Sequence, residues 1–166
     1  MTRKILYALL LALGALICTI FVPRSYQVPS FEKRTMEQYW QLPTGSHIGY
    51  VKLPAKGTKK PYPIVYLHGG PGGFVTDYMC NMLAPLTSDG YDVYLYDQIG
   101  SGHSDRLKNL KDYSVDRHKR DLECVFQQIQ AEKIIMIAQS WGAVLAMYFV
   151  ADHPLDLDDL DRKSVV

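Results

Sequence analysis

The stretch 133–142 reads Lys-Ile-Ile-Met-Ile-Ala-Gln-Ser-Trp-Gly, and it decides the fold of this chain. Its apolar run continues to Ala138 without alternating, as in strands of parallel sheets that are covered on both faces. A second apolar run, at 143–151, has the composition of a helix. The stretch therefore predicts a strand, a tight turn and a helix, with Ser140 at the tip of the turn.

Two similar units precede this one along the chain. A short apolar strand at 64–67 runs into a glycine-rich loop, and another at 91–96 ends at a second glycine-bearing turn. Amphipathic spacing predicts helices at 74–86 and 115–129 between the strands. Alternating strands and helices predict an α/β fold with a mostly parallel sheet, whose ligands bind at the carboxyl ends of the strands.

A hairpin is expected before the parallel strands. Two β-prone stretches, 37–42 and 47–53, flank the turn residues Pro43, Thr44 and Gly45. We therefore expect an N-terminal antiparallel hairpin in the same sheet.

The N-terminal segment is hydrophobic. Residues 5–22 carry no charge and follow Arg3 and Lys4, and their number is just enough for a membrane span of about 17–25 residues. We favour an uncleaved anchor over a cleaved signal peptide or a buried helix. Basic residues flank both ends, so an extracytoplasmic position for the rest of the chain rests on the usual signal-anchor layout; secretion after cleavage is the alternative.

Composition excludes several classes of function. The chain has 166 residues and a net charge of +1, which suits about one domain and provides no basic surface for nucleic acid. Three separated cysteines predict no disulfide framework, and neither they nor the histidines have metal-site spacing. Nothing in the sequence indicates an oligomeric state.

Ser140 is the candidate nucleophile. Small residues two positions away on each side, Ala138 and Gly142, allow the sharp strand-to-helix turn that exposes a serine hydroxyl. A donor from the glycine loop, with the amide of Trp141, could form an oxyanion hole at the helix N-terminus. The alternatives are a serine that only caps the helix and an ordinary glycine turn.

A third motif follows the strand at 91–96 and is expected to brace the loop beside the site. It contains Asp97, Gly100, Gly102 and Ser104, and Asp105 stands where a dinucleotide-binding fingerprint would need its third glycine. We therefore expect a structural role for Asp97 and Ser104.

Three motifs together resemble those of proline iminopeptidases, which are serine aminopeptidases of the α/β-hydrolase fold. They are His68-Gly69-Gly70-Pro71-Gly72, Asp97-Gln98-Ile99-Gly100-Ser101-Gly102-His103-Ser104 and Gln139-Ser140-Trp141-Gly142. The resemblance covers about residues 40–154. It departs from the family pattern where arginine usually stands at Ile99 and His103, and glycine at Ala138.

The resemblance implies specific roles for these residues. Ser140 would be the nucleophile, and the amides of Trp141 and of Gly69 or Gly70 would form the oxyanion hole. The reaction would release an N-terminal residue, often proline, from a peptide through an acyl-enzyme, without a metal or organic cofactor. The remaining motif residues would be structural: His68, Pro71, Gly72, Asp97, Gly100, Gly102 and Gly142.

The expected organisation is an anchor or signal at 1–22, a linker at 23–35, an incomplete α/β-hydrolase domain at 36–154 and an atypical polar tail at 155–166. No apolar strand follows Pro154, so we expect these residues to lack the triad acid and histidine and to be inactive alone. Two other interpretations stay open: a membrane-anchored esterase or lipase-like hydrolase, and a non-catalytic anchored remnant.

Overall fold

The structure is a computed structural model, and it describes residues 3–21, 34, 36–70, 72–131 and 133–153. By their contacts, the residues divide into two compact units, Met1–Ser30 and Phe31–Val166. The anchor and linker of the sequence analysis lie partly outside the described residues, and the tail at 155–166 lies entirely outside them.

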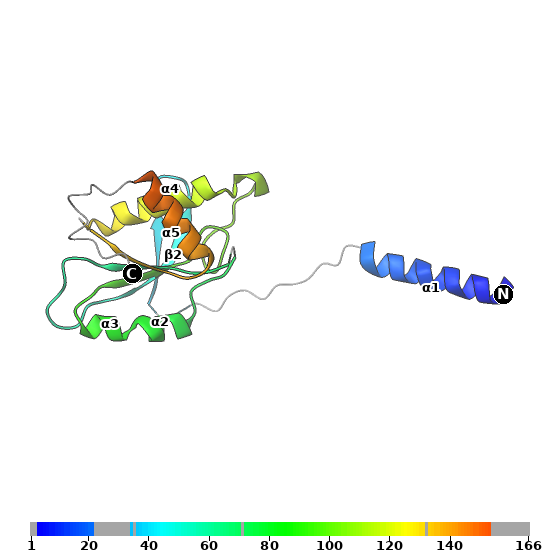
Figure 1. The fold of residues 1–166 in the computed structure, drawn as a ribbon, viewed down its shortest axis with the longest axis horizontal. Helices are drawn as coiled ribbons and strands as arrows, with labels where there is room; N and C mark the ends of the chain where they lie inside the picture. Colours follow the sequence, from blue (N-terminus) through cyan, green and yellow to red (C-terminus); the bar gives the residue numbers. More distant parts are fainter. Residues whose placement is uncertain (1–2, 22–33, 35, 71, 132, 154–166) are drawn as a thin grey trace. The chain divides into compact units, whose positions relative to one another are not determined.

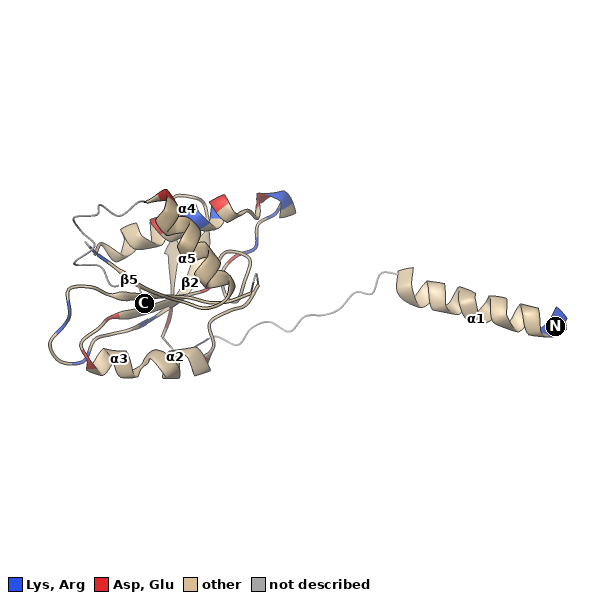
Figure 2. Ribbon diagram, in the orientation of Figure 1, with Lys and Arg blue, Asp and Glu red and all other residues tan. Residues whose placement is uncertain are grey.

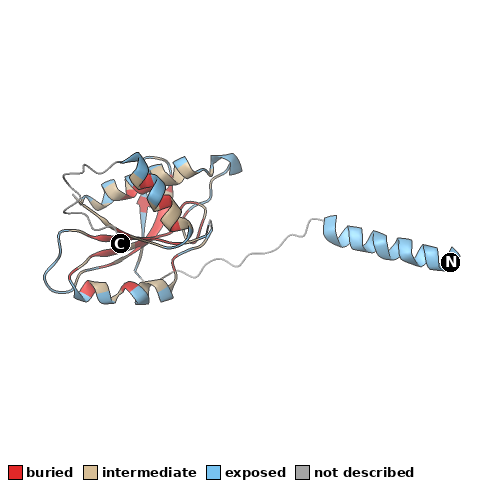
Figure 3. Cartoon of the chain, viewed as in Figure 1, coloured by how far each residue is buried: buried red, intermediate tan, exposed pale blue. Residues whose placement is uncertain are grey.

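The first unit contains one helix, α1 (Arg3–Phe21), with every described residue exposed (Figure 3). Its only charged side chains stand at its start (Figure 2), and the apolar residues that follow surround the whole helix. Among the described helices, α1 alone is long and apolar enough to cross a membrane, a property that N-terminal signal sequences share. The apolar N-terminal helix expected from the sequence is therefore present.

A five-stranded mixed sheet forms the centre of the second unit (Figure 1). Its order is β1-β2-β4-β3-β5, and β2 runs antiparallel to both of its neighbours, whereas β3 runs parallel to β4 and β5. The strands are β1 (Glu37–Gln41), β2 (His47–Leu53), β3 (Ile64–Leu67), β4 (Val93–Tyr96) and β5 (Ile135–Ala138). The predicted hairpin and the predicted parallel strands are thus confirmed.

Helices cover both faces of this sheet. Figure 1 shows α4 (Val115–Ile129) and α5 (Trp141–Asp152) on one side, and α2 (Asp77–Leu83) and α3 (Pro85–Ser88) on the other. A short 3-10 turn at Leu110–Asp112 precedes α4. The α/β fold expected from the alternating strands and helices is therefore confirmed.

The buried side chains form two apolar clusters, one on each face of the sheet. Along β3, Val65 and Leu67 pack into the cluster beneath α4 and α5, whereas Ile64 and Tyr66 pack into the cluster beneath α2 and α3. The four β3 residues are all buried. An uninterrupted apolar strand is what this two-sided burial requires, because successive side chains point to opposite faces.

Two predicted helix boundaries were wrong. The single helix expected at 74–86 is two helices, α2 and α3, because Thr76 caps α2 through its side chain and Pro85 begins a new helix. The last helix starts at Trp141, not at 143, since the chain enters it directly from the turn at Ser140.

Candidate functional site

Ser140 stands at the turn between β5 and α5, with a backbone conformation that is rare for a residue with a side chain. Its φ is 51° and its ψ is −119°. Such a conformation costs about 1–3 kcal/mol and persists only where the surroundings impose it. Here the amide of Gln139 donates to Leu67 O at 3.1 Å, and the amide of Gly142 donates to Gln139 O at 2.9 Å. These bonds hold the turn from both sides.

The hydroxyl of Ser140 is exposed and is not used to cap the helix. Ser140 is the N-cap residue of α5, yet its side chain makes no capping hydrogen bond. By contrast, the side chains of Thr76 and Ser114 both accept a backbone amide at the starts of α2 and α4. The structure therefore gives no support to a serine that serves only as a helix cap.

The glycine loop after β3 approaches this turn so closely that side chains would not fit. A Cβ atom at Gly69 would lie 3.0 Å from Ser140 Cβ, and one at Gly142 would lie 2.2 Å from Leu67 O. The first is a tight contact, and the second is shorter than real Cβ atoms show. Glycine is thus required at 142, whereas a larger residue at 69 would push its neighbours by a few tenths of an ångström.

The place where the glycine loop after β3 meets the Ser140 turn is called the junction below. Three backbone amides there have no acceptor among the described residues: those of Gly69, Gly70 and Trp141. Trp141 is the first residue of α5, and the first amides of a helix have no partner within it. Free amides at a helix N-terminus favour a negative charge. The amide of Trp141 is therefore available to an anionic group at the start of α5.

The junction has two walls, the glycine loop after β3 and the Ser140 turn with the start of α5. A polar network connects them. Trp141 Nε1 donates to Gln98 Oε1 at 2.9 Å, and Gln98 Nε2 donates to His68 O at 3.1 Å. The Gln98 amide also donates to His68 Nε2 at 3.0 Å. Burial lowers the pKa of His68, so its ring is neutral near pH 7. Gln98 had no individual role in the sequence-based expectation.

Asp97 joins the glycine loop to the turn after β4. Its buried carboxylate accepts the amides of Val75 at 2.7 Å and His103 at 2.8 Å. A Cβ atom at Gly102 would lie 2.1 Å from the carboxylate, so glycine is required there. The Ser104 hydroxyl accepts the amide of Gly49 at 2.9 Å and donates to Asp97 O. Asp97 and Ser104 thus hold the loops together, as a bracing role requires.

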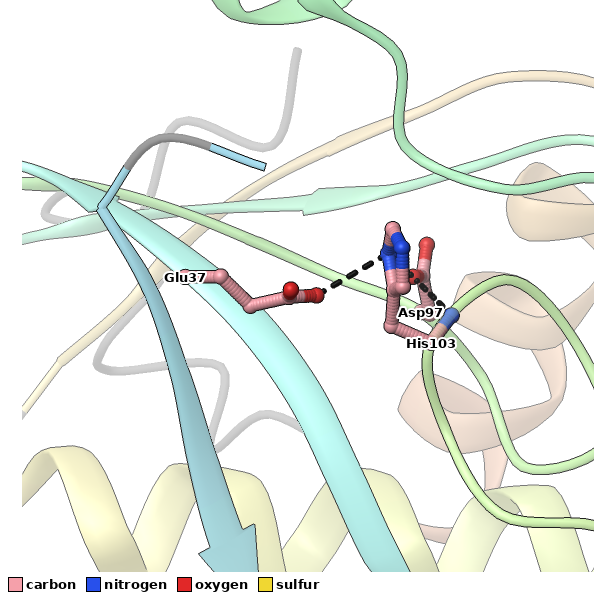
Figure 4. A group of neighbouring side chains, drawn as sticks. All are labelled: Glu37, Asp97 and His103. Carbon is pink, nitrogen blue, oxygen red and sulfur yellow. Dashed lines mark hydrogen bonds and ion pairs between the residues drawn. The ribbon is translucent and has the colours of Figure 1, made fainter. Parts of the chain in front are cut away.

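Three possible metal ligands gather beside this loop: Glu37, Asp97 and His103 (Figure 4). One ligand atom from each lies within 4.8 Å of the others. The guanidinium of Arg34, however, contacts Glu37 Oε1 at 3.0 Å and Asp97 Oδ2 at 2.7 Å. Its positive charge balances the carboxylates that a metal would need, so the arrangement is explained as a buried ion-pair cluster.

The other motif residues lie where the two loops turn. Gly70 and Gly72 have φ values of 60° and 88° in the loop after β3, and Gly100 has 89° against the ring of Tyr113. Pro71 lies outside the described residues. Arg34 lies in the segment 23–35 that the sequence predicts as a linker, and no pattern around it indicates that its side chain reaches the buried Asp97.

Comparisons with known proteins show the family and the fold. A family model described as "alpha/beta hydrolase fold" matches residues 62–159. The proline iminopeptidase of Saccharolobus solfataricus is 36% identical over 119 residues, which are 71% of this chain and 37% of that protein. The proline iminopeptidase of Elizabethkingia meningoseptica is 31% identical over 123 residues, 72% of this chain and 41% of that protein.

Solved structures show the same fold. An alpha/beta hydrolase from Novosphingobium aromaticivorans matches with a TM-score of 0.61 and 24% identity, over 71% of this chain and 40% of that one. An epoxide hydrolase from Vigna radiata matches with a TM-score of 0.60 and 18% identity, over 71% of this chain and 36% of that one. The chain therefore spans about two fifths of the length of the proteins it resembles.

Proposed function

The chain belongs to the α/β-hydrolase family, and from this premise we propose that Ser140 is the nucleophile of a serine hydrolase. One observation carries the proposal. The Ser140 hydroxyl is exposed at a turn of φ 51°, it caps nothing, and it stands at the start of α5 against a glycine loop. A strained backbone conformation at a serine whose exposed hydroxyl makes no capping hydrogen bond is typical of a catalytic nucleophile.

The proposed reaction uses the two walls of the junction for different tasks. Ser140 Oγ attacks the carbonyl carbon of the substrate and passes its proton to a general base. The amides of Trp141 and of Gly69 or Gly70 stabilise the oxyanion. The protonated base then gives its proton to the leaving amine as the intermediate collapses, which leaves an acyl-enzyme for water to hydrolyse. One such amide is worth about 3–4 kcal/mol of transition-state stabilisation.

The proposed reaction also needs a general base that takes the proton from Ser140 Oγ. The chain has five histidines, all of them within the described residues, and none of them hydrogen-bonds to Ser140 there. His68 Nε2 already accepts the Gln98 amide, so this ring is not available to Ser140. We propose that the base and its carboxylate partner come from outside the described residues, and that the 166 residues alone are inactive.

An aminopeptidase is the substrate class we favour. Its support is the name proline iminopeptidase carried by relatives at 31–36% identity, together with the resemblance of the three motifs to that family. Peptides with a free N-terminal proline are then the expected substrates. A membrane-anchored esterase or lipase-like hydrolase is the second candidate, since the same nucleophile and oxyanion arrangement serves ester cleavage.

We also propose that α1 anchors the catalytic unit to a membrane through residues 5–22, with the catalytic unit outside the cytoplasm. The support is a fully exposed apolar helix of 19 residues, preceded by basic residues. Secretion after removal of this segment is the alternative.

The test uses native membranes, in which the protein is expressed from its own gene and a base from outside the described residues can be present, with the protein as wild type, as Ser140→Ala or as Ser88→Ala. Ser88 is an exposed serine in α3, far from the junction in sequence, and serves as the matched control. A fluorophosphonate probe is expected to label wild type and Ser88→Ala and to spare Ser140→Ala. Equal labelling of all three would refute Ser140 as nucleophile, and no labelling of any would favour the non-catalytic remnant.

Substrate class is tested on the same membranes. A prolyl arylamide with a free amine is expected to be cleaved with a kcat/KM at least tenfold above that of the N-acetylated compound. Preference for a short acyl ester over both would favour the esterase.

A further inference from the structure

We propose that Gln98 is a positioning residue that aims the oxyanion-hole amides of the glycine loop and fixes their separation from the nucleophile turn. The inference rests on the proposed function, because it assigns a task to the same junction. The inference rests on three hydrogen bonds, two made by the Gln98 side chain and one by its backbone amide, which together reach both walls.

The orientation of the Gln98 side-chain amide is unambiguous. The indole Nε1–H of Trp141 can only donate, and the carbonyl oxygen of His68 can only accept. Gln98 Oε1 therefore faces the indole, at 2.9 Å, and Gln98 Nε2 faces the carbonyl, at 3.1 Å. The side chain is buried, with an exposed fraction of 4%, so both bonds lie away from competing water.

The bond to His68 O determines where the Gly69 amide points. The carbonyl of His68 and the N–H of Gly69 belong to one planar peptide unit, and in a trans unit they point in opposite directions. The described residues contain no cis peptide. Holding the His68 carbonyl toward Gln98 therefore directs the Gly69 N–H away from Gln98. Gly69 lies next to the nucleophile, because a Cβ atom at this position would be 3.0 Å from Ser140 Cβ.

The next peptide unit is held through the His68 ring. Because the Gln98 amide donates to His68 Nε2, the ring proton is on Nδ1, which lies 3.1 Å from Gly69 O. By the same planarity, holding the Gly69 carbonyl directs the Gly70 N–H. Burial lowers the pKa of His68, which agrees with this neutral form. Gln98 thus acts on both candidate loop donors, directly on one and through His68 on the other.

The bond to Trp141 completes the arrangement. Trp141 supplies the third candidate amide at the start of α5, and its indole is tied to the same side-chain amide that holds the loop. His118 packs edge-on against that indole, with ring centroids 6.0 Å apart, and limits its rotation. Gln98 therefore fixes the distance between the loop donors and the turn donor beyond the strand ends, which the bond from the Gln139 amide to Leu67 O already joins.

The experiment compares Gln98→Met, Gln98→Glu and Trp141→Phe with wild type. The methionine variant removes both side-chain bonds at similar volume. The glutamate variant can still accept the indole but places an oxygen against His68 O, and the phenylalanine variant loses only the indole bond. The control is Gln38→Met, which removes an exposed glutamine whose Oε1 accepts only the Tyr50 hydroxyl.

The first readout needs no catalysis. In spectra of the ¹⁵N-labelled chain in detergent micelles, Gln98→Met is expected to shift the amide signals of Gly69 and Gly70 and lower their heteronuclear NOE values. The signal of Gly45 in the hairpin turn is expected to stay unchanged, and Gln38→Met is expected to move none of the three. Unchanged Gly69 and Gly70 signals in a folded Gln98→Met or Gln98→Glu variant would overturn the proposal.

The second readout is the rate of fluorophosphonate labelling at Ser140 in native membranes. Removing an oxyanion donor outright costs about 100–1,000-fold, so misdirecting the donors is expected to slow labelling about 10–100-fold in Gln98→Met. Trp141→Phe is expected to lose less, and the double variant no more than Gln98→Met, because the two residues act through one side chain. Labelling rates equal to wild type in folded variants would overturn the proposal.

The two readouts separate the two hypotheses. If the Ser140→Ala variant is labelled like wild type, the proposed function fails, and the amide signals still decide whether Gln98 orients the loop. If Gln98→Met does not fold, Trp141→Phe and Gln98→Glu carry both measurements.

Discussion

The close approach of Gly142 to the loop after β3 makes Gly142→Ala a sharp test of the junction. A Cβ atom there would lie 2.2 Å from Leu67 O and 2.8 Å from His68 O, where ordinary contact begins at 3.4 Å. The neighbours are backbone atoms, so no flexible side chain can move aside. The start of α5 and the loop would have to separate by about 1.2 Å, the shortfall at Leu67 O.

Two effects of opposite sign act on the stability of this variant. Alanine favours a helix over glycine by about 1 kcal/mol, whereas overpacking a close-packed region costs about 1–3 kcal/mol or more. Because the clash is with fixed carbonyl groups, we expect its cost to reach or exceed the upper part of this range. The free energy of unfolding should therefore fall by about 2 kcal/mol, and Ser140 labelling should slow at least tenfold as the walls separate.

The assay is urea unfolding of the chain, followed by tryptophan fluorescence and circular dichroism. Gly14→Ala is the matched control: it is also a helical glycine, in α1, but a Cβ atom there meets nothing within 4 Å. We expect Gly14→Ala to leave the unfolding of the second unit unchanged. A Gly142→Ala variant as stable as wild type, or more stable, would refute the close contact on which the site is built.

Two further predictions concern buried charges. Burial alone would raise the pKa of Asp92, but hydrogen bonds from Lys59 and Lys52 outweigh it and bring the pKa from 3.8 to about 2. A depressed carboxyl pKa stabilises the fold above about pH 4, so about 2 kcal/mol should be lost as the pH falls from 4 to 2. Urea unfolding should show the difference between wild type and Asp92→Asn shrinking over that range, and a constant difference would contradict it. Arg34→Met leaves the buried carboxylate of Asp97 without its cation, so the free energy of unfolding should fall by about 3–5 kcal/mol, whereas Arg34→Lys should recover part of it. A thermal midpoint of Arg34→Met equal to that of wild type would show that the ion pair is not formed.

The sequence alone predicted the kind of fold because hydrophobic periodicity is a local property. The uninterrupted strand at 64–67, for example, could be buried only between two helical layers, and both layers are present. The helix at 115–129 was also expected where α4 lies. Boundaries were less predictable, as the split between α2 and α3 shows, because capping by Thr76 competes with the apolar spacing of the surrounding residues.

Part of the candidate site could also be predicted from the sequence, and part of it could not. The serine between a strand and a helix, with Ala138 and Gly142 two positions away on either side, could be recognised from residue type and spacing. The part played by Gln98 could not, because its partners, His68 and Trp141, are 30 and 43 residues away. Arg34 was missed for the same reason: it pairs with Asp97, 63 residues away, from a segment that resembles a linker.

By itself, the sequence determined the order of the strands and helices, apart from the split between α2 and α3, and it placed Ser140 at the turn before the last helix. These follow from local backbone preference and from the periodic burial of apolar groups. Only the tertiary structure decided which distant groups meet: that Gln98 bridges the two walls of the junction, and that Arg34 neutralises a carboxylate at its edge. Hydrogen bonds and ion pairs act over about 3 Å, and sheet order rather than chain order brings their partners within that distance.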